Sequence, residues 1–143
     1  MPANSEILGL EYDWLASDAD GHVALFSTAG GGYAPEAFLM DTDAHDKAID
    51  AILASTASTT GRFAPELATA LKNTWRLAAE RGLFAFDSDA NGGVYRLVAA
   101  PLVPMHVSQV PFVAATVLAT LHLTRVRFAE RSTVSEDQIR HVG

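Results

Sequence analysis

The segment Trp14-Leu-Ala-Ser-Asp18-Ala-Asp20-Gly21-His-Val-Ala-Leu-Phe26 decides how the first part of this chain folds. Two apolar runs flank a turn rich in Asp and Gly, and this arrangement is typical of a β-hairpin. We predict its strands over residues 12–17 and 22–28. Both faces of the second strand carry bulky apolar side chains, so we expect that strand in the middle of a sheet.

The remaining chain alternates hairpin and helix signals. A second hairpin is predicted from residues 83–86 and 94–100, followed by a further strand over residues 125–131. Helices are predicted after the acidic caps at 41–46, from Pro65 to Gly82, from Pro111 through Leu121, and after Ser135. Strands and helices in separate blocks favour an α+β fold. We expect one domain over residues 1–143, in which two or three helices pack on an antiparallel sheet built from two hairpins plus a later strand.

Charge is distributed unevenly along the chain. Residues 1–50 contain ten acidic residues and one basic residue, whereas residues 51–143 contain seven acidic and nine basic residues. A net charge of −7 has the wrong sign for neutralising phosphates, so we expect no nucleic-acid partner. If the acidic residues share one surface, that surface would attract a basic protein. The alternative is that these are ordinary solvated turns and helix faces.

The chain contains no cysteine, which excludes disulfides, thiolate metal sites and cysteine nucleophiles. Its first residues lack the basic and apolar regions of a signal peptide. The longest apolar stretch, residues 111–123, is too short to span a membrane. We therefore expect a cytoplasmic protein with no membrane partner.

Metal and cofactor signals are weak. The turn Asp87-Ser-Asp89-Ala-Asn91-Gly92 matches the start of an EF-hand loop, but Val98 stands where that loop needs a bidentate glutamate. A hairpin turn explains the same residues, although weak divalent-ion binding there stays open. His45 lies among Asp41, Asp43 and Asp46, where an acidic helix start competes with a weak ion cluster. We expect neither a metal nor a cofactor.

Catalytic signals are also weak. The chain has no G-x-S-x-G motif and no nucleophile beside a base signature. The pairs Asp18/Asp20 and Asp87/Asp89 lie in turns that we expect to be solvated, whereas catalytic carboxylates need unequal environments. We therefore expect a protein that is not an enzyme.

Three segments of hairpin residues carry a family resemblance that covers most of the chain: Trp14-x3-Asp18-x2-Gly21-His-Val-Ala-x-Phe26-x-Thr28, then Gly82-Leu-Phe-Ala-Phe86-Asp87, then Tyr95-Arg96-x4-Pro101. This pattern resembles a family of small uncharacterised bacterial proteins, some of which are encoded beside secreted polymorphic toxins as their immunity proteins. It contains no catalytic motif. The resemblance implies a non-catalytic inhibitor that neutralises a cognate toxin by binding it directly.

The resemblance and the charge distribution together suggest where such a toxin would bind. Many toxins are basic, so we expect contacts from the acidic turns and from residues beside the loop Gly30–Gly32. We also expect an aromatic anchor after that loop, where nothing in the sequence indicates burial. The expected partner-binding residues are Asp18, Asp20, Tyr33, Glu36, Phe38, Asp41 and Asp43.

Two other functions remain open at this point. One is a generic interaction or regulatory module whose protein partner is not a toxin. The other is a small enzyme that uses Asp18, Asp20 or the cluster around His45. Loss of an activity in Asp18→Asn or His45→Ala, with the fold intact, would favour the enzyme.

Overall fold

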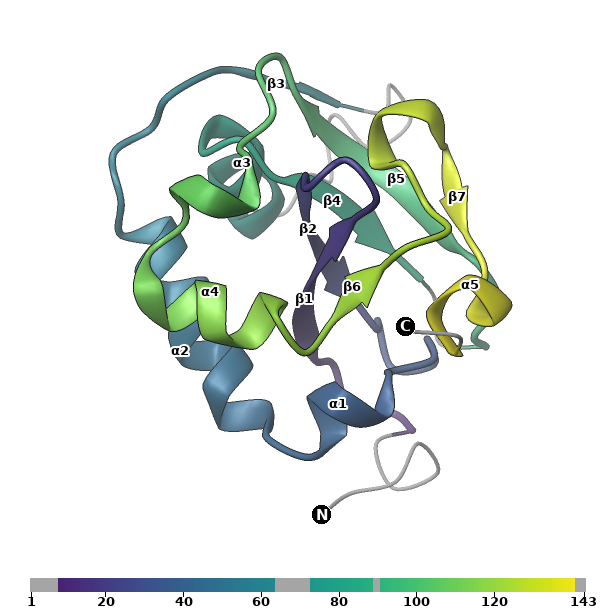
Figure 1. Ribbon diagram of the computed structural model, residues 1–143. Coiled ribbons are helices and arrows are strands. Elements are labelled where there is room, and N and C mark those ends of the chain that lie inside the picture. The colour runs from purple at the N-terminus through teal and green to yellow at the C-terminus, as the bar shows by residue number, and fades with distance from the viewer. Residues whose placement is uncertain (1–7, 64–72, 89–90, 141–143) are drawn as a thin grey trace.

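The computed structural model describes residues 8–63, 73–88 and 91–140, in which a mixed β-sheet is covered by helices (Figure 1). Within these residues the sheet has seven strands in the order β3-β5-β4-β2-β1-β6, with β7 paired to β5. The α+β class predicted from the sequence is confirmed. The strands are β1 Asp13–Asp18, β2 Val23–Ser27, β3 Gly61–Phe63, β4 Phe84–Asp87, β5 Tyr95–Pro101, β6 His122–Leu123 and β7 Thr133–Val134.

The helices connect these strands and cover the sheet. They are α1 Glu36–Leu39, α2 Thr42–Leu53, α3 Asn73–Glu80, α4 Phe112–Leu118 and α5 Glu136–Arg140, with the 3₁₀ turns η3 Val107–Gln109 and η4 Phe128–Glu130. The predicted helices after Asp41, Pro111 and Ser135 are confirmed. The helix predicted from Pro65 is present as α3, and its predicted start lies outside the described residues. Gly82 follows α3 with φ of +90°, a conformation in which glycine commonly ends a helix.

Both predicted hairpins are present. β1 pairs antiparallel with β2, in a register that places Asp13 opposite Ser27 and Ser17 opposite Val23. β4 likewise pairs antiparallel with β5. The two hairpins join through β2 and β4, which run parallel, and β6 pairs parallel with β1. The sheet is therefore mixed rather than wholly antiparallel. As predicted, β2 is a central strand, because it lies between β1 and β4.

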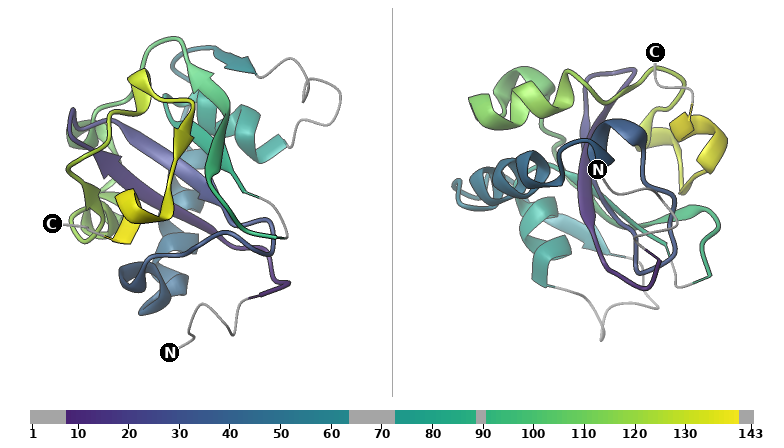
Figure 2. Two further views of the ribbon diagram at one scale, coloured as in Figure 1. Left: turned by 90° about the vertical axis from the view of Figure 1, so that its right-hand side faces the viewer. Right: turned by 90° about the horizontal axis from the view of Figure 1, so that it is seen from below.

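Hydrophobic residues cover both faces of the sheet. On one face, sheet residues such as Leu15 and Leu25 share a hydrophobic cluster with residues of α2, α3 and α4, among them Trp75 of α3. The opposite face packs on the C-terminal segment, including Phe128, Val134 and Ile139. The right-hand view of Figure 2 shows the three helices on one side of the sheet and the C-terminal segment on the other. This double burial explains why neither face of β2 is polar.

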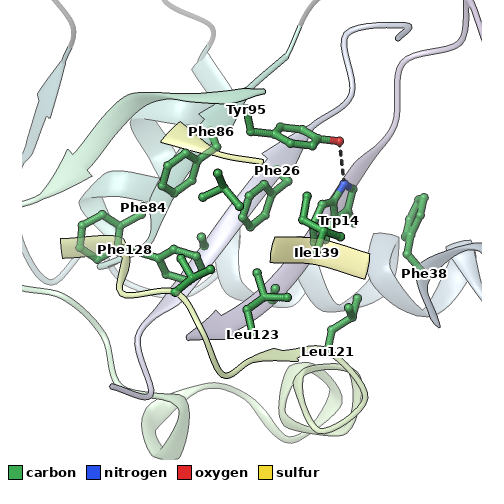
Figure 3. Packing of buried hydrophobic residues seen from close by; sticks show 14 of the residues in the cluster. Trp14, Phe26, Phe38, Phe84, Phe86, Tyr95, Leu121, Leu123, Phe128 and Ile139 are labelled. Atoms are coloured by element: carbon green, nitrogen blue, oxygen red, sulfur yellow. Dashed lines mark hydrogen bonds between the residues drawn. The ribbon is translucent and has the colours of Figure 1, made fainter. Parts of the chain in front are cut away.

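Aromatic side chains fill the face that packs on the C-terminal segment (Figure 3). The Trp14 and Phe26 rings stack with centroids 4.1 Å apart, and Phe86 stacks on Phe26 at 5.1 Å. The Tyr95 hydroxyl accepts a hydrogen bond from Trp14 Nε1 at 3.2 Å and donates one to the Tyr33 carbonyl at 2.6 Å. Burial raises the pKa of Tyr95 above its usual range, so the phenol stays protonated and keeps both bonds.

The strand predicted over residues 125–131 is wrong. This stretch contains turns and the 3₁₀ turn η4. The predicted alternation is nevertheless real, since Val126 and Phe128 are fully buried. The Phe128 amide donates a hydrogen bond to the carboxylate of Asp18 at 2.7 Å instead of to the carbonyl of a neighbouring strand. A side chain therefore satisfies this backbone amide, and the segment does not join the sheet.

Candidate functional site

Four acidic residues line a hollow between the start of β1 and α2. Glu11 and Asp13 come from the β1 side, and Asp46 and Asp50 come from α2, one helical turn apart. The hollow has a volume of about 460 Å³, and Tyr12, Ile49, Leu53 and Thr74 complete its lining. We call it the acidic hollow. Its lining offers carboxylates to a cation and apolar surface to an aliphatic side chain.

Like charges are close together in the acidic hollow. Partial burial raises the pKa of Asp46, and the neighbouring carboxylates of Asp43, Asp50 and Asp13 raise it further. In the described residues no lysine or arginine forms an ion pair with Asp43, Asp46 or Asp50. A cation bound in the hollow would relieve this repulsion.

A buried histidine joins the two walls of the acidic hollow. His45 on α2 is 2% exposed, and its Nδ1 accepts a hydrogen bond from the Leu15 amide of β1 at 3.0 Å. Burial lowers the pKa of His45 to about 4, and the charge of Asp41 opposes this shift only in part. His45 is therefore neutral near pH 7, and its Nδ1 already has a partner. The interpretation of this region as an acidic helix start is favoured, because the Asp41 side chain accepts from the Ala44 amide.

The predicted partner-binding residues separate into different environments. Glu36, Asp41 and Asp43 are exposed on α1 and at the start of α2, and Asp43 is close enough to Asp46 of the acidic hollow to raise its pKa. Phe38 is fully buried and packs edge-on against His45, with ring centroids 4.9 Å apart. The expectation that nothing buries Phe38 is wrong, because α1 turns this side chain into the core.

Asp18 and Asp20 lie at the far end of β1 from the acidic hollow. Asp18 is fully buried, and one carboxylate oxygen accepts from the amides of Asp20 and His22 at 2.9 Å each. Its other oxygen accepts from the Phe128 amide. The expectation that this turn carboxylate is solvated is wrong. Asp18 organises a turn, and in this conformation it presents no surface to a partner.

Asp20 points outward and pairs with Arg127. Its carboxylate lies 2.7 Å from the guanidinium, and both side chains are partly exposed. The acidic residues of the N-terminal third therefore do not form one continuous surface. A strand of six residues spans about 20 Å, and β1 separates Asp18 and Asp20 from the acidic hollow by that length.

Tyr33 lies at a third place, a crevice where two glycine-rich loops meet. The loops follow β2 and β4, which are parallel neighbours, and contribute Gly30–Gly32 and Gly92–Gly93. The crevice has a volume of about 590 Å³. The guanidinium carbon of Arg140 lies 4.8 Å from the centre of the Tyr33 ring, so the predicted anchor is already covered in part by α5.

Within the described ranges, one group of side chains could approach a metal ion together: Asp18, Asp20 and His22. The oxygens of Asp18 already accept three backbone hydrogen bonds, and Asp20 already pairs with Arg127. The turn and the ion pair therefore account for the two carboxylates, whereas Nδ1 of His22 is buried and has no hydrogen-bond partner among the described residues. Asp89 of the second acidic turn lies outside the described residues.

His122 and Ser17 form the nearest arrangement to a catalytic pair. The Ser17 hydroxyl lies 2.9 Å from His122 Nδ1, but Ser17 is only 2% exposed. Neither residue lines the acidic hollow or the crevice beside Tyr33. His122 is half-buried on β6, and Ser17 occupies its Nδ1.

The partner-binding residues predicted from the sequence do not include Glu11, Asp13, Asp46 or Asp50. The four-residue spacing of Asp46 and Asp50 on a helix was a usable signal. No local signal could predict that these two residues approach Asp13, because that approach depends on how α2 packs on β1.

No protein-family model, curated protein or solved structure matches this chain. Among the described residues, no helix combines the length and the apolar character that a membrane crossing requires. Function is therefore inferred from the geometry of the chain itself.

Proposed function

We propose that this chain is a non-catalytic binding protein, an immunity-type inhibitor that neutralises a basic toxin by direct contact. The acidic hollow is the observation that carries the proposal. Asp13, Asp46 and Asp50 line a concavity large enough for the side chain of a lysine or arginine, and the charges of Asp13 and Asp50 lie close enough to raise the pKa of Asp46. The exposed carboxylates of Glu36, Asp41 and Asp43 extend the negative charge over α1 and the start of α2.

Two physical effects act together at this surface. Exposed carboxylates at the rim speed the encounter with a positively charged partner, and this effect weakens as salt increases. A cation inside the hollow loses water and gains several carboxylates, so it contributes mainly to the lifetime of the complex.

An apolar contact lies among the same acids. Met40 ends α1 between Glu36 and Asp41, and its side chain is 66% exposed. A flexible methionine adapts to an irregular partner surface. Met40 therefore replaces Phe38 as the proposed apolar contact beside the acidic hollow.

The test is co-expression with the product of the neighbouring open reading frame, followed by pull-down at low and high salt. We expect that product to be toxic alone, and we expect this chain to rescue growth and to form a complex whose association slows with salt. The double variant D46N/D50N should weaken the complex at least about tenfold, because two charges leave the hollow. The matched control is the exposed Asp137→Asn on α5, which changes charge away from the hollow.

The opposite results discriminate the alternatives. A stable complex with a harmless neighbour would favour the generic interaction module. The absence of both toxicity and a complex would remove the inhibitor proposal. A complex that D46N/D50N leaves unchanged would move the contact surface away from the acidic hollow.

A further inference from the structure

A second polar hollow lies between β6 and β7, and its charge is opposite to that of the acidic hollow. Residues 124–133, the segment between these strands in Figure 1, form most of it. It has a volume of about 510 Å³, and all of its lining residues except Ala19 have polar side chains. We call it the arginine hollow. Its lining is Ala19, Thr124, Arg125, Arg127, Glu130, Arg131, Ser132 and Thr133.

Buried side chains attach the backbone around the arginine hollow to the hydrophobic core. Val126, Phe128 and Val134 are fully buried, so the segment is attached to the core at three points. The Phe128 amide donates to Asp18, and the Ala19 amide donates to the Val126 carbonyl at 2.9 Å. The arginines therefore project from a backbone that is already ordered, which lowers the entropy lost on binding.

The three arginines differ in how far their charges are neutralised. Arg127 pairs with Asp20 at 2.7 Å. Within the described residues no carboxylate forms an ion pair with Arg125 or Arg131. Glu130 is the one acidic residue in the lining. Two guanidinium groups thus remain available beside the hydroxyls of Ser132 and Thr133.

We propose that the arginine hollow binds a phosphate group, either free or as the monoester of a small molecule. Guanidinium groups present paired N–H donors that match the oxygens of a phosphate, and serine and threonine hydroxyls add neutral donors. Most of the lining surface is polar, so recognition is directed to the anion and not to a large apolar body. This proposal is independent of toxin binding, since it concerns the opposite end of β1.

The test is a titration of the full chain with inorganic phosphate, followed by ¹H–¹⁵N NMR at constant ionic strength set by chloride. We expect saturable shifts centred on the amides of Ser132 and Thr133. A parallel titration with glycerol phosphate distinguishes the two sources: binding of phosphate alone indicates a free anion, and binding of both indicates a site open to monoesters. Chloride alone should produce no saturable shift at these amides.

Single variants distinguish specific phosphate binding in the arginine hollow from general attraction of phosphate to positive charge. Arg125→Gln and Arg131→Gln should each weaken phosphate binding about tenfold, as expected for loss of a charged hydrogen bond. Glu130→Gln should strengthen binding about threefold, because it removes a repulsive carboxylate. Arg76→Gln on α3 is the matched control and should leave binding unchanged. All four residues are exposed, so an unchanged melting temperature should accompany each variant.

Three results of the phosphate titrations would overturn the proposal. They are shifts equal to those caused by chloride, shifts located away from residues 124–133, and affinity that falls as much in Arg76→Gln as in Arg131→Gln. Binding of a short single-stranded RNA with no response to phosphate or glycerol phosphate would also overturn it, since the hollow would then serve a polyanion surface.

Discussion

The acidic hollow and the arginine hollow lie at opposite ends of β1 and are supported in opposite ways. Asp13, at the start of β1, lines the first, and Ala19, just after its end, lines the second. A buried neutral imidazole, His45, joins the walls of the acidic hollow. A buried carboxylate, Asp18, holds the backbone of the arginine hollow. In each case a buried polar side chain holds the backbone beside the exposed charges: a neutral imidazole beside the acids and a carboxylate beside the arginines.

This comparison shows that the charge count of a sequence segment does not describe a surface. The N-terminal acids suggest one negative face, yet Asp18 is internal and Asp20 is paired with Arg127. The remaining exposed acids lie in two groups, one near each end of β1, separated by the length of that strand. The molecule therefore has two sites of different chemistry, and each can be altered without touching the other.

The largest expected effect comes from removing the support of the arginine hollow. In Asp18→Asn the amide nitrogen would face a backbone donor, so a buried hydrogen bond is lost and a donor is left unpaired. We expect the free energy of unfolding to fall by about 3 kcal/mol, as measured by urea denaturation. Hydrogen exchange at the Phe128 amide should become faster.

Asp20→Asn is the matched control for this change. It lies in the same turn, but it removes only a partly exposed ion pair, which contributes less than about 1 kcal/mol. Equal stability losses in the two variants would contradict the supporting role of Asp18.

The next effect concerns the support of the acidic hollow and depends on pH. The pKa of His45 is about 4 in the folded chain, whereas the usual value in an unfolded chain is about 6.5. Between these values only the unfolded chain takes up the proton, so stability is retained above pH 6.5 and falls as pH decreases towards 4. We expect a loss of about 2 kcal/mol between pH 7.5 and pH 5, measured by urea denaturation at several pH values.

The variant His45→Gln isolates this contribution, because glutamine has no proton to gain. The free energy of unfolding of this variant should be lower at pH 7.5. Between pH 7.5 and pH 5 it should lose about 2 kcal/mol less than the unmodified chain does. A slope equal to that of the unmodified chain would show that another group titrates in this range.

The smallest expected effect is a gain in stability from reducing repulsion in the acidic hollow. Asp46→Asn removes a charge whose neighbours are Asp43, Asp50 and Asp13. We expect the free energy of unfolding to rise by about 0.5 kcal/mol at low salt and the gain to disappear near about 1 M salt. Asp137→Asn should have the opposite sign, since an acid in the first turn of a helix is stabilising.

Local signals in the sequence predicted the two hairpins of the sheet and its main helices, but they did not predict β3, β6 or β7. The Asp-Gly turn between apolar runs indicated the first hairpin, and the cap at Asp41 indicated α2. The alternation of Val126 and Phe128 with polar residues also predicted which side chains are buried. These signals are local because hairpin turns, caps and burial periodicity depend on neighbours a few residues apart.

The candidate sites were less predictable, since each depends on contacts between distant segments. Phe38 followed a glycine-rich loop, and nothing local indicated that α1 would bury it. Arg125 and Arg131 stood at the two ends of a predicted strand. Their meeting at one hollow depends on the Phe128 amide finding Asp18, 110 residues earlier in the chain.

By itself, the sequence determined the α+β class, the two hairpins, the absence of cysteine chemistry and the excess of acid in its first third. Only the tertiary structure decided that the hairpins join through parallel strands, that Asp18 and Phe38 are internal, and that acids and arginines collect at opposite ends of β1. The physical reason is that composition and periodicity act over a few residues. The surroundings of a charge, in contrast, depend on which distant backbone and side-chain groups satisfy it once the core has packed.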